Sequence, residues 1–250
     1  MAEFDGIRAQ LYKECLKEFP RARDKDIEVM KKYLAPKETE TIVEVGAGNG
    51  MFSSKIAVML KKGRLIVSDP SKEQLNEILS QKIKNIEVIE AGAEELELKK
   101  ESIDAIWSFG AMHHCHHKSE AFQKFNQVLK KNGRLIIADV WSGSKLAQHF
   151  DDKVAKYCVT GHEVSFWTDE YAESLCYLNG FEKPKIIDLD IKWKFQSKKD
   201  IGIFLYKIHA MTKTSSEECL KGAEKILGIK KKGPIYELNW PMKILLSRKK

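Results

Sequence analysis

The stretch TIVEVGAGNG at residues 41–50 constrains the fold more than any other part of the chain. Its first half has the β-branched and apolar character of a buried strand, and its second half carries Gly46, Gly48 and Gly50 at alternating positions. A helical pattern follows at once over residues 51–61. Gly46 permits a tight turn, Gly48 lets a ligand approach the backbone, and the helix start offers free N–H groups. The stretch therefore predicts a strand, a turn and a helix that together bind a nucleotide-like cofactor.

Strand and helix patterns alternate regularly from this stretch up to residue 139. Such alternation predicts a parallel sheet with right-handed crossovers and helices on both faces, which is an α/β fold. Ligands of these sheets bind at the carboxyl ends of the strands, so the segments at those ends should converge on the glycine turn. The expected strands cover residues 42–45, 64–69, 85–90, 105–109 and 134–139, and the expected helices between them cover 51–61, 70–81 and 119–129.

The segments outside this core are expected to surround it. Two helical patterns at residues 1–36 predict an N-terminal helical cap, and residues 37–250 form the main domain. Residues 143–167 show no clean period, and residues 197–232 carry two helical patterns. We expect both segments to act as lid or cap segments. The main domain should also contain a strand within residues 181–195 and a last strand at residues 240–248.

Composition excludes several classes of protein. The chain has no apolar run long enough for a membrane span and no signal-peptide pattern at its start, so we expect a cytoplasmic protein. Its 5 cysteines are scattered without a C-x-x-C pair, which indicates reduced thiols. The net charge of +7 comes from dispersed lysines, and no run interleaves basic and aromatic residues. A nucleic acid is therefore not an expected partner.

The spacing of the glycines, together with acidic residues near them, indicates a protein family. The register is G-x-G-x-G instead of the dinucleotide pattern G-x-G-x-x-G, Glu44 stands two residues before the first glycine, and Asp69 ends the next strand. Together with LKKNGRLIIAD at residues 129–139, these features resemble the class I S-adenosylmethionine-dependent methyltransferases. The resemblance is to the small-molecule type that includes the ubiquinone and menaquinone methyltransferases, and it covers about residues 38–140.

The resemblance implies the fold and the cofactor. The expected fold is a Rossmann-like, doubly wound sheet of seven strands with the last strand antiparallel, N-terminal helices and a helical insertion before that last strand. The expected cofactor is S-adenosyl-L-methionine, with S-adenosyl-L-homocysteine as product. The insertion at residues 197–232 could form a lid wall, a contact in a homodimer or a simple cover, and the sequence does not choose among these.

The same resemblance assigns the cofactor-binding residues. Asp69 should accept hydrogen bonds from the ribose hydroxyls, although a helix-capping carboxylate is the alternative. Glu44 should orient the glycine turn, which passes the amino acid end of the cofactor. The other residues expected in the turn and at the strand end are Gly46, Ala47, Gly48 and Pro70.

The adenine site departs from the family pattern. The position of the acid that usually meets the adenine amine is occupied by Gly92, so this side-chain contact is missing. The N–H of Ala93 can still meet the ring, and Glu94 either substitutes for the acid or is a surface residue at a helix start. Ser108 and Phe109, at the end of the fourth strand, should line the floor of the site.

The string MHHCHH at residues 112–117 could bind zinc, but adjacent residues rarely point at one ion, so no metal is predicted. The resemblance instead places one of His113 and His114 in the pocket as the candidate general base, with purely structural histidines as the alternative. The expected acceptor pocket contains Tyr12, Trp141 and His162.

The sequence therefore predicts an S-adenosylmethionine-dependent methyltransferase that acts on a small organic acceptor. Two alternatives stay open at this point. One is a methyltransferase acting on RNA or protein, which would need a contiguous basic face. The other is a cofactor-binding protein without catalytic activity.

Overall fold

The computed structural model describes residues 4–250 and divides into two compact units. The sheet unit consists of residues 29–139, 164–188 and 243–250, and the accessory unit consists of residues 1–28, 140–163 and 189–242. Residues 1–3, where the predicted N-terminal cap begins, lie outside the described residues. Among the described helices, none combines the length and the apolar character that crossing a membrane requires.

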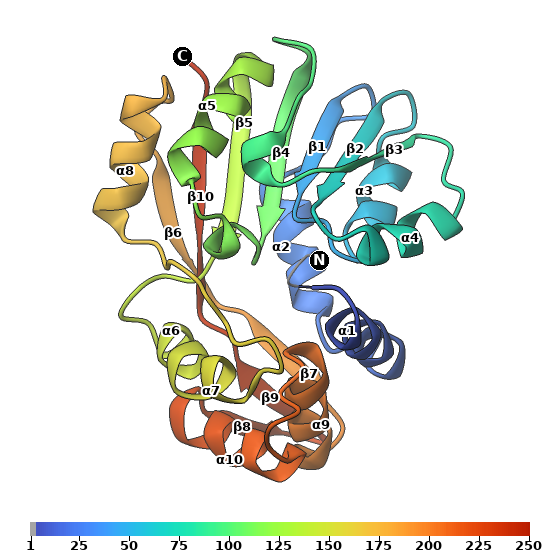
Figure 1. The fold of residues 1–250 in the computed structure, drawn as a ribbon, viewed down its shortest axis with the longest axis vertical. Coiled ribbons are helices and arrows are strands. Elements are labelled where there is room, and N and C mark those ends of the chain that lie inside the picture. Colours follow the sequence, from blue (N-terminus) through green and yellow to red (C-terminus); the bar gives the residue numbers. More distant parts are fainter. Residues whose placement is uncertain (1–3) are drawn as a thin grey trace. The chain divides into compact units, whose positions relative to one another are not determined.

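The sheet unit is built on a seven-stranded sheet in the order β3-β2-β1-β4-β5-β10-β6 (Figure 1). Strands β1 to β5 pair in parallel, and β10 runs antiparallel to β5, with Lys243 opposite Asp139 and Arg248 opposite Arg134. This confirms the predicted fold. The strands are β1 (Thr41–Val45), β2 (Arg64–Asp69), β3 (Ile86–Glu90), β4 (Ile103–Phe109), β5 (Leu129–Asp139), β6 (Lys185–Leu189) and β10 (Met242–Arg248).

The strand order reverses direction between β1 and β4. From β1 the chain moves to β2 and β3, and from β4 it moves the opposite way to β5. In sheets of this order, right-handed crossovers place the two sets of helices on opposite faces, and ligands bind outside the carboxyl ends of the strands at the reversal, which are β1 and β4 here. The helical segments of this unit are α3 (Ser53–Met59), α4 (Lys72–Ser80), η1 (Ala93–Glu95), η2 (Met112–His114), α5 (Lys118–Val128) and α8 (Asp169–Leu178), and α2 (Asp24–Tyr33) crosses the unit boundary.

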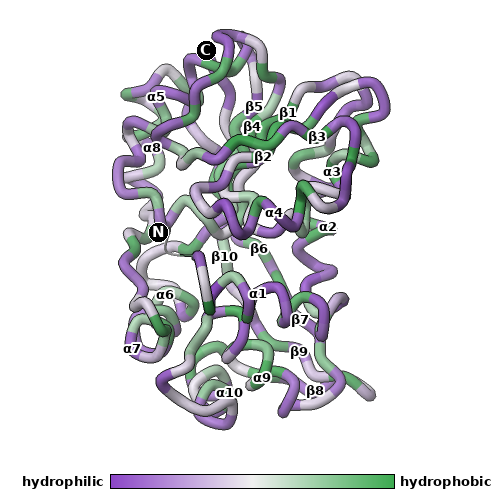
Figure 2. The backbone as a smooth tube through the Cα atoms, turned by 45° about the vertical axis from the view of Figure 1, so that its right-hand side comes forward, coloured by the Kyte–Doolittle hydropathy of each residue, from purple (hydrophilic) through white to green (hydrophobic). Residues whose placement is uncertain are grey.

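The central strands are buried because they read as almost continuous apolar runs, as expected for strands covered on both faces. Ile42, Val43, Ile106, Leu135 and Ile137 are all fully buried. Figure 2 shows the same strands as a hydrophobic zone of the backbone.

Local signals set the ends of the helices. Ser71 caps α4, the helix expected over residues 70–81, and its hydroxyl accepts a hydrogen bond from the N–H of Gln74. The helix after the glycines starts later than predicted, at Ser53, because Gly46, Gly48 and Gly50 all have positive φ and the turn continues through Phe52.

The accessory unit contains helices and a three-stranded antiparallel sheet in the order β7-β9-β8. On one face of this sheet, Trp193, Leu238 and Ile229 lie in register with one another. The elements are α1 (Ile7–Glu18), α6 (Lys145–His149), the π-helical turn η3 (Phe150–Val154), α7 (Ala155–Tyr157), β7 (Lys192–Phe195), α9 (Lys198–Ile208), α10 (Ser216–Ile226), β8 (Ile229–Lys232) and β9 (Ile235–Asn239).

The structure differs from the sequence prediction in several element assignments. Residues 181–195 hold β6 and β7, which belong to two different sheets, and not one strand. The β8–β9 hairpin was not predicted, because its lysine-rich first strand is largely exposed. Residues 143–167 are not irregular throughout: Ser144 caps α6, which continues into η3 and α7.

Strand β5 also begins earlier than predicted, at Leu129. Residues 130–133, which separate the expected helix from the expected strand, are an irregularity within β5. The β4–β5 register shifts there, between the pairs Ile103–Leu129 and Ala105–Arg134. Asn132 takes a positive φ in this stretch, which allows the extra residues to be accommodated.

Candidate functional site

The glycine turn leaves the end of β1 and folds back on β2. The N–H groups of Gly46 and Ala47 both donate to the carbonyl of Ser68, at 2.8 and 3.1 Å. A Cβ on Gly46 would lie 2.2 Å from the Cβ of Ala111, whereas a Cβ on Gly48 would meet nothing within 4 Å. Gly46 is therefore required by packing, and Gly48 borders open space where a ligand can approach the backbone.

Asp69 joins this turn to the end of β2. Its Oδ2 accepts the N–H of Gly48 at 2.8 Å, and its Oδ1 accepts the N–H of Ser71 at 2.9 Å. The carboxylate is therefore fixed at the start of α4, which is the capping role raised as the alternative. A carboxylate oxygen can accept more than one hydrogen bond, so this role does not conflict with the predicted contact to the ribose. Pro70, the next residue, is exposed.

Glu44 lies beneath the turn and is almost completely buried. Its Oε2 accepts the hydroxyl of Ser53, the first residue of α3, at 2.6 Å. Burial raises the pKa of Glu44 to about 8, with a smaller contribution from the nearby charge of Asp69, although the bond from Ser53 acts in the opposite direction. Glu44 thus links β1 to α3 across the glycine turn, as a neutral carboxylic acid near pH 7.

The predicted adenine and floor residues lie at the ends of β3 and β4. Ala93 is buried at the start of η1, and the N–H of Gly92 donates to Oε2 of Glu95 at 3.2 Å. Phe109 packs on Phe52, with ring centroids 5.0 Å apart. Ser108 is fully buried, and its hydroxyl has no hydrogen-bond partner within residues 4–250.

Glu94 makes contacts that sequence reasoning missed. Its Oε1 accepts the thiol of Cys115 at 3.1 Å and the N–H of His117 at 3.2 Å. Burial opposes its ionisation, but these hydrogen bonds lower the pKa of Glu94 below its ordinary value. The carboxylate therefore holds the histidine-rich loop in place. Its predicted contact with adenine stays a prediction.

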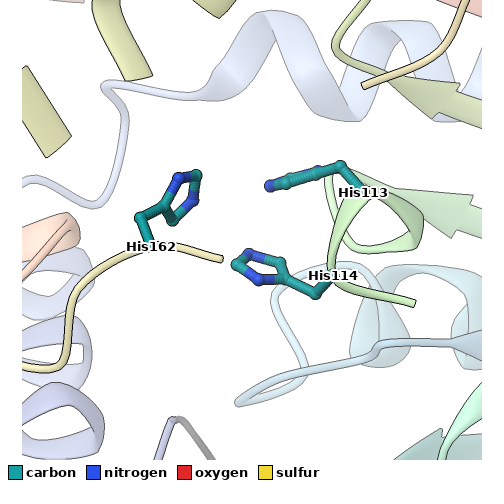
Figure 3. A group of neighbouring side chains, drawn as sticks. All are labelled: His113, His114 and His162. Atoms are coloured by element: carbon teal, nitrogen blue, oxygen red, sulfur yellow. The ribbon is translucent and has the colours of Figure 1, made fainter. Parts of the chain in front are cut away.

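His113 forms a buried pair with Asp139, the last residue of β5. Its Nδ1 lies 2.6 Å from Oδ1 of Asp139, and its backbone N–H donates to Oδ2 at 3.0 Å. In the tautomer that carries its proton on Nδ1, this nitrogen donates a hydrogen bond to the carboxylate, and Nε2 keeps its lone pair and can act as a base. His114 lies beside it on η2, with ring centroids 4.2 Å apart (Figure 3).

The rest of the loop is held by Lys118, a buried lysine at the start of α5. Its ammonium donates to the carbonyl of Cys115 at 2.8 Å and also to the hydroxyl of Ser165. Burial lowers the pKa of Lys118. The N–H of Ser165 in turn donates to the carbonyl of His113 at 2.9 Å. His113 is therefore fixed from both its side chain and its backbone.

The residues predicted for the acceptor pocket all belong to the accessory unit. The hydroxyl of Tyr12 accepts a hydrogen bond from Arg23 at 3.1 Å, and Arg23 also donates to Asp26 at 2.6 Å. Trp141 is buried just before α6. His162, also labelled in Figure 3, packs edge-on against Phe150 with ring centroids 4.9 Å apart.

Sequence reasoning did not assign Asp139 to the site, although its position at the end of a strand could have indicated it. It also did not single out two histidines of the accessory unit, His149, which is buried, and His209, which is half-buried. Both lie at helix ends without any motif, so no sequence signal marks them.

A family model described as a methyltransferase domain matches residues 36–201. The ubiquinone/menaquinone biosynthesis C-methyltransferase UbiE of Campylobacter jejuni is 30% identical over 116 residues, which are 44% of this chain and 48% of that protein. The chain thus spans about half the length of the curated relatives it matches.

Solved structures agree in fold. The YcgJ protein of Bacillus subtilis gives a TM-score of 0.66 at 16% identity, covering 90% of this chain and 97% of that one. Phosphoethanolamine N-methyltransferase 2 of Haemonchus contortus, solved with phosphomonomethylethanolamine and S-adenosylhomocysteine, gives 0.64 at 14% identity over 90% of this chain and 52% of that one.

The fold and the glycine turn define an α/β domain built to bind a nucleoside-containing cofactor. The chain belongs to the methyltransferase-domain family, as the sequence predicted, and the cofactor that this family implies is S-adenosylmethionine. The residues fit that cofactor in two respects. Gly48 borders open space beside the turn, and the buried hydroxyl of Ser108 has no partner within residues 4–250.

Proposed function

We propose that this methyltransferase acts on a small organic acceptor, with His113 as general base. The buried pair of His113 and Asp139 supports the proposal most directly, since it fixes the imidazole at the end of the sheet where the glycine turn lies. The relatives give further support. UbiE takes its name from ubiquinone and menaquinone biosynthesis, and the Haemonchus contortus enzyme was solved with phosphomonomethylethanolamine, which is a small molecule.

The cofactor would be held by the residues at the carboxyl ends of β1 to β4. The carboxylate of Asp69, held at the end of β2 by the N–H groups of Gly48 and Ser71, would accept hydrogen bonds from the ribose hydroxyls. The turn at Gly46, Ala47 and Gly48 would pass the amino acid end. The adenine would lie against Ala93 and the end of β4.

S-adenosylmethionine, when bound, supplies an electrophilic methyl group on a positively charged sulfur. His113 would take, at Nε2, the proton that the acceptor atom loses as it gains the methyl group. Asp139 would keep the imidazole in the required tautomer and stabilise the imidazolium that forms. The bonds from Ser165 and Lys118 would hold the loop still while the acceptor is aligned.

Calorimetry with S-adenosylhomocysteine tests the cofactor site. We expect saturable binding to the native protein and a loss of affinity well over tenfold in Asp69→Ala. Glu90→Ala is the matched control, because Glu90 is an exposed carboxylate directly beside Asp69 in the β2–β3 register. Absence of binding to the native protein would overturn the proposed cofactor site.

A screen with isotopically labelled methyl donor tests the acceptor. Phenols, amines, thiols and quinone-like compounds should be compared with RNA and with protein extracts under the same conditions. We expect label to enter at least one small molecule. Label that enters only RNA or protein would refute the small-molecule proposal and support the macromolecular alternative.

A further inference from the structure

The carboxylate of Glu94 connects two parts of the candidate site. Glu94 is the middle residue of η1, the short helical turn that follows β3. Its Oε1 accepts the thiol of Cys115 at 3.1 Å and the N–H of His117 at 3.2 Å, which ties it to the histidine-rich loop that contains His113. Its Oε2 lies over Gly92, since a Cβ placed on Gly92 would lie 3.3 Å from that oxygen. One oxygen therefore holds the loop, and the other lies beside a residue that has no side chain.

The segment before η1 lies directly beside the end of β2. The N–H of Ala91 donates to the carbonyl of Asp69 at 3.2 Å, and the hydroxyl of Ser68 donates to the carbonyl of Ala91 at 2.6 Å. The sheet order β3-β2-β1 puts the glycine turn and η1 on opposite sides of Asp69. In the cofactor, the ribose separates the base from the sulfur and the amino acid end. A ribose on Asp69 with the amino acid end at the glycine turn therefore directs the base toward Gly92.

A carboxylate at this position selects a base that donates a hydrogen bond. Burial opposes the ionisation of Glu94, but the hydrogen bonds from Cys115 and from backbone N–H groups lower its pKa below the ordinary value, so the group is charged near pH 7. A charged carboxylate only accepts hydrogen bonds. Adenine carries an exocyclic amine, which donates, whereas hypoxanthine carries a carbonyl oxygen at the same position, which the carboxylate would repel.

We propose that Glu94 recognises the exocyclic amine of the cofactor's adenine and that this contact orders the histidine-rich loop. The inference rests on the proposed function, because it concerns the same cofactor site and the same loop. It adds selectivity for the base and a coupling between cofactor binding and the loop that carries His113. Such coupling is reciprocal, so a change in the loop that releases Glu94 also weakens cofactor binding.

Calorimetry with two ligands that differ in one group tests the selectivity. The ligands are S-adenosylhomocysteine and S-inosylhomocysteine, in which a carbonyl replaces the exocyclic amine. We expect the native protein to bind S-adenosylhomocysteine about tenfold more tightly or better. Glu94→Gln should reduce this ratio to below about threefold, because an amide can accept from the amine or donate to the carbonyl. Equal affinities in the native protein would overturn the inference.

Glu95 provides the matched control, because it is the neighbouring acid of η1 and lies only slightly farther from Gly92. Its Oε2 accepts the N–H of Gly92 at 3.2 Å, and a Cβ on Gly92 would lie 3.7 Å from it. Glu95→Gln should keep the native ratio between the two ligands. A native ratio in Glu94→Gln would overturn the assignment to Glu94, whatever Glu95→Gln does.

Hydrogen–deuterium exchange measures the coupling. The N–H of His117 donates to Glu94, so a peptide covering residues 112–118 reports whether the loop is held. Saturating S-adenosylhomocysteine should slow exchange in this peptide about tenfold, and saturating S-inosylhomocysteine should slow it by less than about threefold. Equal protection by the two ligands would refute the coupling, since their shared ribose and amino acid end would then account for it.

Two variants of Cys115 test the reciprocal effect. Cys115→Ala removes the thiol that Glu94 accepts, so it should weaken S-adenosylhomocysteine binding about fivefold and leave S-inosylhomocysteine binding unchanged. Cys115→Ser keeps a donor in the same place and should bind both ligands like the native protein. Native affinity for S-adenosylhomocysteine in Cys115→Ala would contradict the coupling.

The outcomes separate this inference from the proposed function. If the native protein binds neither ligand, the proposed cofactor site fails. If it binds both ligands equally, and Asp69→Ala weakens both, the cofactor site stands and only the role of Glu94 is overturned.

Discussion

Glu44→Gln should make the protein more stable at alkaline pH, although it changes a residue under the cofactor turn. Glu44 is buried beneath that turn with the hydroxyl of Ser53 as its hydrogen-bond donor. Burial raises its pKa from the ordinary 4.5 to about 8. The folded protein therefore keeps a proton on Glu44 at pH values where the unfolded chain has already released it.

The sign and the size follow from proton linkage. Between the two pKa values the folded state binds more protons, so this group's contribution to stability is fully present below pH 4.5 and is lost as the pH rises to about 8. Each pH unit within that window costs ~1.4 kcal/mol. The unfolding free energy should therefore fall by roughly 3 kcal/mol between pH 5 and pH 8 through Glu44 alone. Glutamine has nearly the same shape and cannot ionise, so the variant escapes this loss.

Urea denaturation at pH 5, 6, 7 and 8 measures the effect. The quantity of interest is the unfolding free energy of Glu44→Gln minus that of the native protein, because groups that titrate in both proteins cancel. This difference should rise steadily with pH. Glu87→Gln removes an exposed carboxylate from β3 of the same sheet, and its difference should stay flat. A flat difference for Glu44→Gln would refute the conclusion that Glu44 is buried as a neutral acid.

Three further predictions concern the turn, the dyad and the thiols. Gly46→Ala should cost about 2 kcal/mol more unfolding free energy than Gly48→Ala in urea denaturation, because its Cβ would lie 2.2 Å from Ala111. Equal costs would contradict that packing. Asp139→Asn should lower methyl transfer about 100-fold and leave S-adenosylhomocysteine affinity nearly unchanged by calorimetry, because the carboxylate acts through His113. Unchanged turnover would exclude the dyad. All 5 cysteines are buried, so a colorimetric thiol reagent at pH 8 should titrate them only after denaturation, and rapid reaction in the native state would contradict their burial.

The parts of the fold that the sequence predicted depend on short-range chemistry. Alternating glycines after an apolar strand require positive φ, and Gly46, Gly48 and Gly50 adopt it. Ser71 caps its helix within three residues of its own position. The β8–β9 hairpin could not be predicted in this way, because its stability depends on the pairing of β9 with β7, about 40 residues earlier in the chain.

In the candidate site, too, the residues set by local chain geometry could be predicted and the long-range contacts could not. Asp69 could be predicted because it is the last residue of β2, and a strand end next to a glycine turn has a defined place in this fold. His113 lies on η2, after β4, and Asp139 is the last residue of β5, so their pairing joins residues that are 26 positions apart in the sequence. Its distance and its tautomer depend on how β4 and β5 pair, so only the structure gives them.

Recognition of the acceptor is harder to predict than recognition of the cofactor, for a physical reason. The glycine turn presents backbone groups, whose geometry follows from the spacing of three residues. The accessory unit instead brings together side chains from separate segments between His149 and Trp240, which meet only after folding. His149, for example, is completely buried and has no hydrogen-bond partner for either ring nitrogen within residues 4–250, yet no local pattern in the sequence marks it. Binding measurements on the folded protein should therefore identify the acceptor sooner than a search for motifs.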